Sequence, residues 1–192
     1  MDPSATATRD EIPPPAWPGG AVAAFPRVLI FGCGNLLLSD EGFGVQLIRR
    51  LQEQYEFPPN VRLFDGGTLG ILVAHELEQA DAVIIIDTVR AEGRPGQVFR
   101  FTKPDFMLRR LPLKLSPHQI GVQEMLVVSE LRGHCPAEIV LLGVLPETIA
   151  PGCNLSPALQ SALELVARLV RHELERFGVG AERESIAGRE SP

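Results

Sequence analysis

Uninterrupted apolar runs alternate along the chain with stretches in which apolar residues recur every three or four positions. The runs predict buried β-strands, and they lie at 27–32, 61–68, 81–89, 96–101 and 138–147. The run at 81–89 is the most hydrophobic, and it predicts a central strand, because a strand covered on both faces loses its alternation of apolar and polar residues. The run at 96–101 predicts an edge strand.

Helical periodicity predicts helices over 42–55, 70–80, 119–133 and 156–178, with a variable, proline-bounded connection over 103–117. In the last helix Ser156 is a suitable N-cap, Pro157 suits the first turn and Gly178 follows the last turn. Strands that alternate with helices predict the α/β fold class, here three layers with a twisted, mostly parallel sheet of about five strands and helices on both faces. We expect a disordered N-terminal extension over 1–26, one α/β domain over 27–178 and a flexible polar tail over 179–192.

Composition narrows the class of protein. The formal charge of −6, with no cluster of Lys and Arg, disfavours nucleic acid as a partner. No apolar run approaches the roughly 20 residues that span a bilayer, and the acidic, proline-broken start lacks the pattern of a secretory signal. The three cysteines form no Cys-x-x-Cys motif, which favours a reduced, cytoplasmic location and gives no metal–thiolate motif.

The loop after the first strand, GCGNLLLSDEGFG (32–44), is similar to a dinucleotide-binding turn. That fingerprint, however, needs a third glycine, and Leu37 occupies its position here. Asp40 and Glu41 would also meet a pyrophosphate with two negative charges. A nucleotide-binding Rossmann protein is therefore a poor alternative. A second alternative is that Ser39, Asp40 and Glu41 merely cap the helix that follows.

Acidic residues follow three of the predicted strands. Glu41 follows the first strand, Asp65 the second and Asp87 the third. Because ligands of open parallel sheets bind beyond the carboxyl ends of the strands, these acids should share one edge. His118 lies at a loop-to-helix junction and could join them, although a lone histidine is more often structural. Glu, Asp and His together suit Ni²⁺ or Zn²⁺, but spacing alone does not establish that Glu41, Asp87 and His118 converge.

Five motifs in order resemble the [NiFe]-hydrogenase maturation endopeptidases: GCGNLLLSDEGFGV, FDGGT, IIIDTV, SPHQ and GVLPE, within 28–177. The resemblance is greatest to the branch that processes large subunits of uptake hydrogenases. It implies an α/β protease domain that removes the C-terminal extension of the large-subunit precursor after nickel insertion. By motif, Glu41, Asp87 and His118 correspond to the metal-contacting residues, and Asp65 to a further residue of recognition or turnover.

The resemblance also sets expectations for ligands and partners. We expect Asn35, Gly66, Gly67 and Thr68 to bind the substrate, with the glycines allowing a close backbone approach. The expected nickel is carried by the precursor rather than held tightly by the enzyme, and Zn²⁺ or another divalent ion could substitute in vitro. The enzyme is expected to be cytoplasmic and monomeric, with no nucleic-acid or membrane partner.

The mechanism stays open between two routes. Either a carboxylate acts as general base on water, or the metal polarises the scissile carbonyl. The predicted catalytic residues are Glu41, Asp87, His118 and Asp65, and their individual roles stay open. Cysteine and serine nucleophiles are poorly supported, because no Cys–His pattern and no Gly-x-Ser-x-Gly elbow occurs, and the buried small thiol of Cys33 needs no reactive role. The alternative function is a non-catalytic, nickel-dependent chaperone that binds the same precursor.

Overall fold

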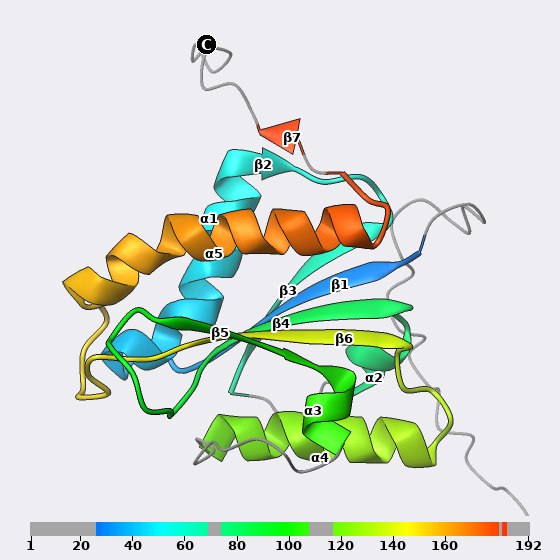
Figure 1. The fold of residues 1–192 in the computed structure, drawn as a ribbon, viewed down its shortest axis with the longest axis horizontal. Coiled ribbons are helices and arrows are strands. Elements are labelled where there is room, and N and C mark those ends of the chain that lie inside the picture. Colours follow the sequence, from blue (N-terminus) through cyan, green and yellow to red (C-terminus); the bar gives the residue numbers. More distant parts are fainter. Residues whose placement is uncertain (1–25, 69–73, 108–116, 181, 184–192) are drawn as a thin grey trace, which may run out of the picture.

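A single sheet organises the protein, whose computed structural model describes residues 26–68, 74–107, 117–180 and 182–183. The strand order is β3-β1-β4-β6-β5 (Figure 1). Four strands are parallel and β5 runs antiparallel to β6, so the predicted, mostly parallel sheet is confirmed. β4 is central and β5 is an edge strand, as predicted. The strands are β1 Val28–Cys33, β3 Val61–Gly67, β4 Ala82–Thr88, β5 Val98–Thr102 and β6 Glu138–Val144.

Helices cover both faces of the sheet, which confirms the three-layer arrangement. α1 (Phe43–Gln54) and α5 (Pro157–Arg176) pack on one face, and α2 (Ala74–Glu78) and α4 (Pro117–Leu131) on the other (Figure 1). Alternate residues of each strand supply the two cores, because successive side chains point to opposite faces. Within the described ranges, no helix is long and apolar enough to cross a membrane.

The boundaries of α5 follow the predicted chemistry. The hydroxyl of Ser156 accepts a hydrogen bond from the Leu159 N–H at 3.3 Å, and Pro157 occupies the first turn. Gly178 follows the helix with φ of +75°, a left-handed conformation that glycine adopts at little cost. These local signals determine where α5 begins and ends.

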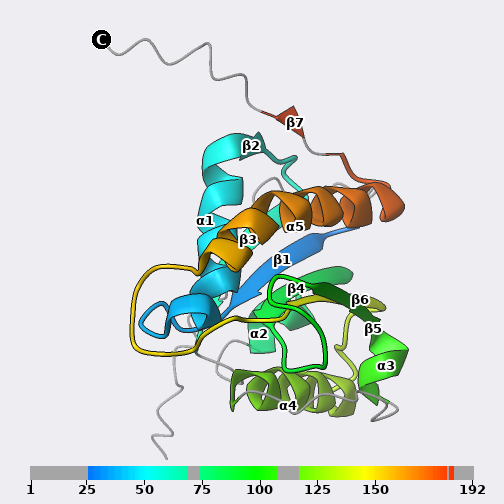
Figure 2. The ribbon, with the colours of Figure 1, turned by 60° about the vertical axis from the view of Figure 1, so that its left-hand side comes forward.

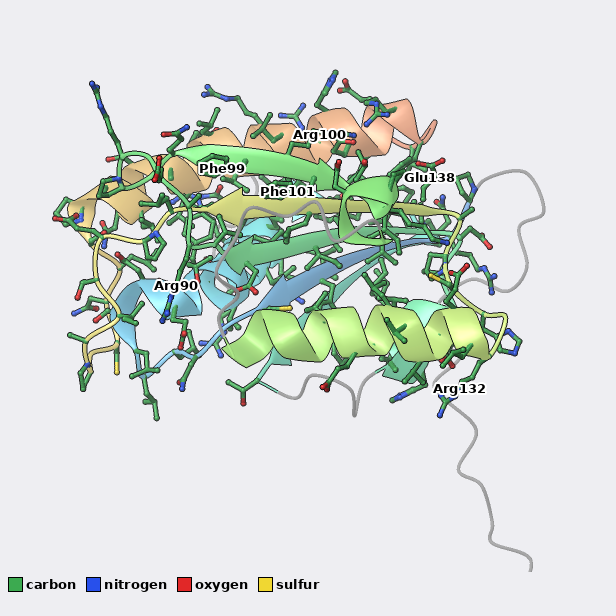
Figure 3. All side chains as sticks on the ribbon, turned by 60° about the horizontal axis from the view of Figure 1, so that its bottom comes forward. Arg90, Phe99, Arg100, Phe101, Arg132 and Glu138 are labelled. Atoms are coloured by element: carbon green, nitrogen blue, oxygen red, sulfur yellow. The ribbon has the colours of Figure 1, made fainter. Side chains whose placement is uncertain are left out.

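The edge strand β5 is held to α5 by charge. The Arg100 guanidinium donates to the buried Glu173 carboxylate of α5, with Nε to Oε1 at 2.7 Å (Figure 3). On the other face of β5, the stacked rings of Phe99 and Phe101 pack against the core beneath α2 and α4. Alternation along β5 therefore joins both layers at the edge of the sheet.

The connection after β5 differs from the prediction. Its first part is a short helix, α3 (Lys103–Met107). The Asp105 carboxylate accepts hydrogen bonds from the Thr102 N–H at 2.7 Å and from the Thr102 hydroxyl at 2.8 Å. A threonine followed three residues later by an acid resembles a capping box, a helix-start signal that the prolines obscured. Residues 108–116 of the predicted connection lie outside the described residues.

The C-terminal segment also differs in one place. Glu182–Arg183 forms β7, which pairs antiparallel with β2 (Tyr55–Glu56) at the end of α1. These two residues therefore pair with the domain, where a flexible tail was expected. Val179 and Gly180, the first residues of the predicted tail, are also described, and Val179 is buried in the core. The predicted N-terminal extension, apart from residue 26, and residues 181 and 184–192 of the tail lie outside the described residues.

Two glycines bring α1 close to the sheet. A Cβ atom on Gly44, in the first turn of α1, would lie 2.3 Å from the Cys33 carbonyl oxygen and 2.4 Å from that of Ile86. A Cβ atom on Gly32 would lie 2.5 Å from the Gly44 carbonyl oxygen. The helix therefore starts directly on the ends of β1 and β4. Gly44 thus supplies the close helix–strand packing whose glycine the sequence pattern lacked.

Asp40 ties two distant segments together. Its buried carboxylate accepts three backbone N–H groups: Glu147 at 2.8 Å and Thr148 at 3.0 Å on Oδ2, and Ser156 at 2.6 Å on Oδ1. Asp40 lies in the 3₁₀ turn η1 (Ser39–Gly42), and neither this turn nor α1 has a side-chain cap. The interpretation that Ser39, Asp40 and Glu41 cap a helix is therefore wrong.

We expect the substitution Asp40→Ala to lower the free energy of unfolding by about 3 kcal/mol, because the buried N–H of Ser156 and the part-buried N–H groups of Glu147 and Thr148 lose their acceptor. Urea denaturation followed by circular dichroism measures this change. The control is Glu164→Ala, which removes a partly exposed ion pair with Arg50 and should change stability by less than about 1 kcal/mol. Equal effects of the two substitutions would contradict the bracing role of Asp40.

Candidate active site

The carboxyl ends of β1 and β4 diverge at the centre of the sheet. The chain leaves β1 through α1 toward β3 on one side, and leaves β4 toward β5 and β6 on the other side, with α4 in that connection. Because α1 and α4 also lie on opposite faces, the connections separate at this point. Such a switch of direction is where open α/β sheets bind ligands. Glu41 and Asp87 both lie at this edge.

The loop before α1 turns Glu41 back toward the strand ends. Gly34 has φ of +137°, and a Cβ atom there would lie 1.8 Å from the Glu41 carbonyl oxygen. The same carbonyl accepts the Asn35 N–H at 3.1 Å. Only a glycine at position 34 allows this return. Glu41 is consequently 4% exposed, in the turn that leads directly into α1.

Asp87 is the last residue but one of β4, a strand that is buried along its whole length, and Asp87 itself is fully buried. Its Oδ1 accepts the Thr88 N–H at 2.7 Å, whereas its Oδ2 has no hydrogen-bonding partner within the described part of the chain. Burial raises the pKa of Asp87 to about 7, the Thr88 N–H opposes this rise, and the charge of Glu41 adds to it. Near neutral pH this carboxyl is therefore close to half protonated.

Cys33 lies beside Asp87 on the neighbouring strand. The residues before them, Gly32 and Ile86, are paired in the parallel register of β1 and β4. Burial raises the pKa of the Cys33 thiol well above its ordinary value, and the charges of Asp87 and Asp65 raise it further. A neutral thiol is a poor nucleophile, so this environment agrees with an unreactive Cys33.

His118 lies in the first turn of α4. This helix covers the same face as the side chains of Val83 and Ile85, which precede Asp87 on β4. Because α4 leads into the start of β6, its own first turn lies toward the carboxyl edge of the sheet. The side chain of His118 lies outside the described residues. Among the side chains that are described, no group of three His, Cys, Asp or Glu forms a metal site.

Asp65 and the residues predicted to bind substrate frame the edge next to β1. Asp65 is partly exposed; its Oδ1 accepts the Gly67 N–H at 3.1 Å, and its Oδ2 lies 3.6 Å from the Arg49 guanidinium. The Gly67 carbonyl accepts the Gly34 N–H at 2.9 Å, which joins this turn to the Glu41 loop. Asn35 uses its side-chain oxygen on the Leu37 N–H, at 3.0 Å.

The glycines of this turn have internal reasons to be glycine. A Cβ atom on Gly66 would lie 2.4 Å from the Phe31 ring, and Gly67 has φ of +46°. Close packing inside the chain therefore explains Gly66 without any substrate. Thr68 is exposed at the end of the turn. Substrate contact by Asn35, Gly66, Gly67 and Thr68 stays a prediction.

The arrangement is suited to a cation. The buried carboxylates of Glu41 and Asp87 repel each other, and the Oδ2 atom of Asp87 has no donor among the residues that the structure describes. A positive ion there would offset the charge and contact this oxygen. The same carboxylates would repel a phosphate. Glu41 and Asp87 were predicted from the sequence. The role of Asp40 was not, because the N–H groups that its carboxylate accepts lie more than a hundred residues away.

Comparisons with known proteins agree with this site. A family model described as hydrogenase maturation protease matches residues 45–173. The chain is 39% identical to the hydrogenase expression/formation protein HoxM of Azotobacter vinelandii, with 87% of this chain and 82% of that protein covered. It is 31% identical to the hydrogenase 2 maturation protease of Escherichia coli, over 81% of this chain and 94% of that protein.

Solved structures show the same fold. The hydrogenase maturating endopeptidase HybD from Escherichia coli superposes with a TM-score of 0.77 at 31% identity, covering 82% of this chain and 98% of that one. A solution structure of an endopeptidase from the same organism gives a TM-score of 0.78 at 32% identity, over 84% and 99% of the two chains. These matches show that the chain belongs to the hydrogenase maturation protease family.

Proposed function

We propose that the protein is the endopeptidase that removes the C-terminal extension from the nickel-loaded precursor of a [NiFe]-hydrogenase large subunit. Relatives named as hydrogenase maturation proteases support the reaction class. The observation that carries the choice of a cationic ligand is the buried carboxylate of Asp87, whose Oδ2 has no donor within the described ranges and which lies in the field of the Glu41 charge. The nickel is part of the substrate in this proposal, and the enzyme needs no tightly bound cofactor.

Recognition of nickel would use Glu41, Asp87 and His118. Two carboxylates and an imidazole form a donor set suited to borderline divalent ions such as Ni²⁺, and Zn²⁺ could replace it in vitro. A precursor without metal would bring no cation to offset the repulsion between Glu41 and Asp87. Nickel-loaded precursor should therefore bind more tightly, so that cleavage follows metal insertion.

Hydrolysis needs a water molecule that loses a proton. A carboxyl with a pKa of about 7, such as Asp87, suits a general base near neutral pH. When Asp87 contacts the nickel, the metal is the alternative activator, by polarising the scissile carbonyl. Asp65, partly exposed on the adjoining strand, would contact the substrate chain. We further propose a monomeric, cytoplasmic enzyme, and its three free cysteines fit a reduced compartment.

The substitutions Glu41→Gln, Asp87→Asn and His118→Ala should each slow precursor processing by about a hundredfold or more, since each removes one contact to the cation. The measurement is the loss of mass at the C-terminus of nickel-loaded precursor, followed by mass spectrometry. His75→Ala is the control: its side chain is half exposed on α2 and should leave the rate unchanged.

Two results would contradict the proposal. Processing at the normal rate by His118→Ala would remove the histidine from nickel recognition. A precursor that binds the parent protein tightly without losing mass would instead support the non-catalytic chaperone. Nickel-free precursor provides the matched substrate control, and it should not be cleaved.

The raised pKa of Asp87 also predicts the pH dependence of stability without metal. The folded protein keeps a proton between the ordinary pKa of 3.8 and about 7 that the unfolded chain has released, so the free energy of unfolding falls as pH rises through this window. Asp87→Asn removes this loss while its side-chain oxygen can still accept the Thr88 N–H. The variant should be roughly 3 kcal/mol more stable than the parent above pH 7, and the difference should vanish near pH 4.

Urea denaturation at pH 5 and pH 8 measures this difference. Asp65→Asn, at a partly exposed carboxyl, is the matched control and should shift stability by less than about 0.5 kcal/mol. A loss of stability in Asp87→Asn at both pH values would contradict a destabilising charge at this position.

A further inference from the structure

Two large aliphatic side chains are exposed beside the crevice. Leu37 is 68% exposed in the loop before η1, and Ile149 is 41% exposed in the loop between β6 and α5. Figure 2 shows the two loops side by side, the yellow loop that follows β6 running next to the blue turn that precedes α1. Leu37 and Ile149 are called the apolar rim below.

The backbone beneath the apolar rim is fixed by reciprocal hydrogen bonds. The Gly152 N–H donates to the Leu37 carbonyl at 2.9 Å, and the Ser39 N–H donates to the Gly152 carbonyl at 2.7 Å. The Ser39 hydroxyl donates to the Ala150 carbonyl at 2.9 Å. The Asp40 carboxylate holds the same loop through Glu147 and Thr148. The exposure of Leu37 and Ile149 is therefore a property of an ordered surface.

Ser39 shows that this loop conformation has a cost. Its φ is +49°, the only positive value among the non-glycine residues that the structure describes. Non-glycine residues in this region persist only where the surroundings enforce them, and they gather at functional sites. Ser39 follows Leu38, which pairs with Gly152 in an isolated β-bridge. The strained conformation is therefore held at the point where the two loops meet.

The loop on either side of Ile149 is uncharged over four residues. Thr148, Ile149, Ala150 and Pro151 are exposed and uncharged, and the exposed Glu147 precedes them. Three other large aliphatic residues are exposed in the described part: Val127 and Leu131 on α4, and Leu165 on α5. Leu131 ends α4 next to the amino edge of the sheet, away from the crevice. Of these exposed aliphatic residues, only Leu37 lies in the loop that carries Glu41, and Ile149 lies in the loop hydrogen-bonded to it.

We propose that the apolar rim docks an apolar surface of the precursor polypeptide next to the segment held in the crevice. This inference rests on the proposed function, which supplies a protein substrate at this site. Leu37 lies four residues before Glu41 in the same ordered loop, so the apolar rim adjoins the place where the metal of a bound polypeptide would lie. The rim then provides binding free energy that does not depend on nickel, by removing two aliphatic side chains from water.

The test compares steady-state kinetics of the double variant Leu37→Ser/Ile149→Ser with the parent, on nickel-loaded precursor. KM should rise about tenfold while kcat changes by less than about twofold, because the rim contacts no reacting atom. Leu131→Ser and Leu165→Ser are the controls, since Leu131 is more exposed than Leu37 and Leu165 is as exposed as Ile149. The conservative pair Leu37→Met/Ile149→Val should retain the parent KM.

A KM of the double variant equal to that of the two controls would overturn the inference. Binding distinguishes this failure from failure of the proposed function. If the parent does not cleave the precursor, the affinity of uncleaved precursor for parent and double variant, measured by calorimetry, still tests the rim. A tenfold weaker affinity of the double variant supports docking, and an unchanged affinity rejects it. Urea denaturation confirms that the double variant is folded.

Discussion

The site depends on a carboxylate that is buried near the end of the central strand β4. Asp87 is fully buried, one of its oxygens has no donor in the described part of the chain, and Glu41 adds a second buried acid beside it. Holding such a group ionised costs the folded state several kcal/mol, since a buried charge needs pairing to be tolerated. Three apolar isoleucines, Ile84 to Ile86, lead to it along β4. A cation contacted by Asp87, as in the proposed function, would offset this cost.

Asp40 and Asp87 show how environment separates two identical side chains. Asp40 is as buried as Asp87, yet three backbone N–H groups satisfy its two oxygens and fix the loops on both sides of the crevice. Asp87 has one such donor. The first carboxylate therefore stabilises the fold, and the second retains capacity for a ligand. Glu41, adjacent to Asp40 in sequence, is positioned by the brace that its neighbour makes.

Much of this architecture could be predicted from the sequence, because local signals decided it. Apolar runs gave the strands, and Ser156 with Pro157 gave the start of α5. The central position of β4 followed from its lack of alternation. The acids at the strand ends followed from the rule that parallel strands share a carboxyl edge, and family resemblance selected Glu41 and Asp87 among them.

Features that depend on distant partners could not be predicted in this way. The donors to Asp40 lie 107 to 116 residues along the chain, and the atoms that require Gly44 belong to two other strands. The interpretation of Asp40 as a cap used the sequence neighbours, which do not contact its carboxylate. The short helix α3 had a local signal at Thr102 and Asp105, but the surrounding prolines outweighed it.

The same crevice serves anions in dinucleotide-binding proteins, and the difference lies in what precedes the helix. In those proteins the helix starts directly after the strand, so its free N–H groups face a phosphate. Here Gly32 and Gly44 keep the helix equally close to the strands, but a loop and a 3₁₀ turn with two carboxylates come between. Glu41 is thereby placed at the strand ends with Asp87 opposite, and the field at this edge becomes negative. The loop and the 3₁₀ turn before α1 thus replace the free N–H groups that would attract a phosphate by carboxylates that would repel it.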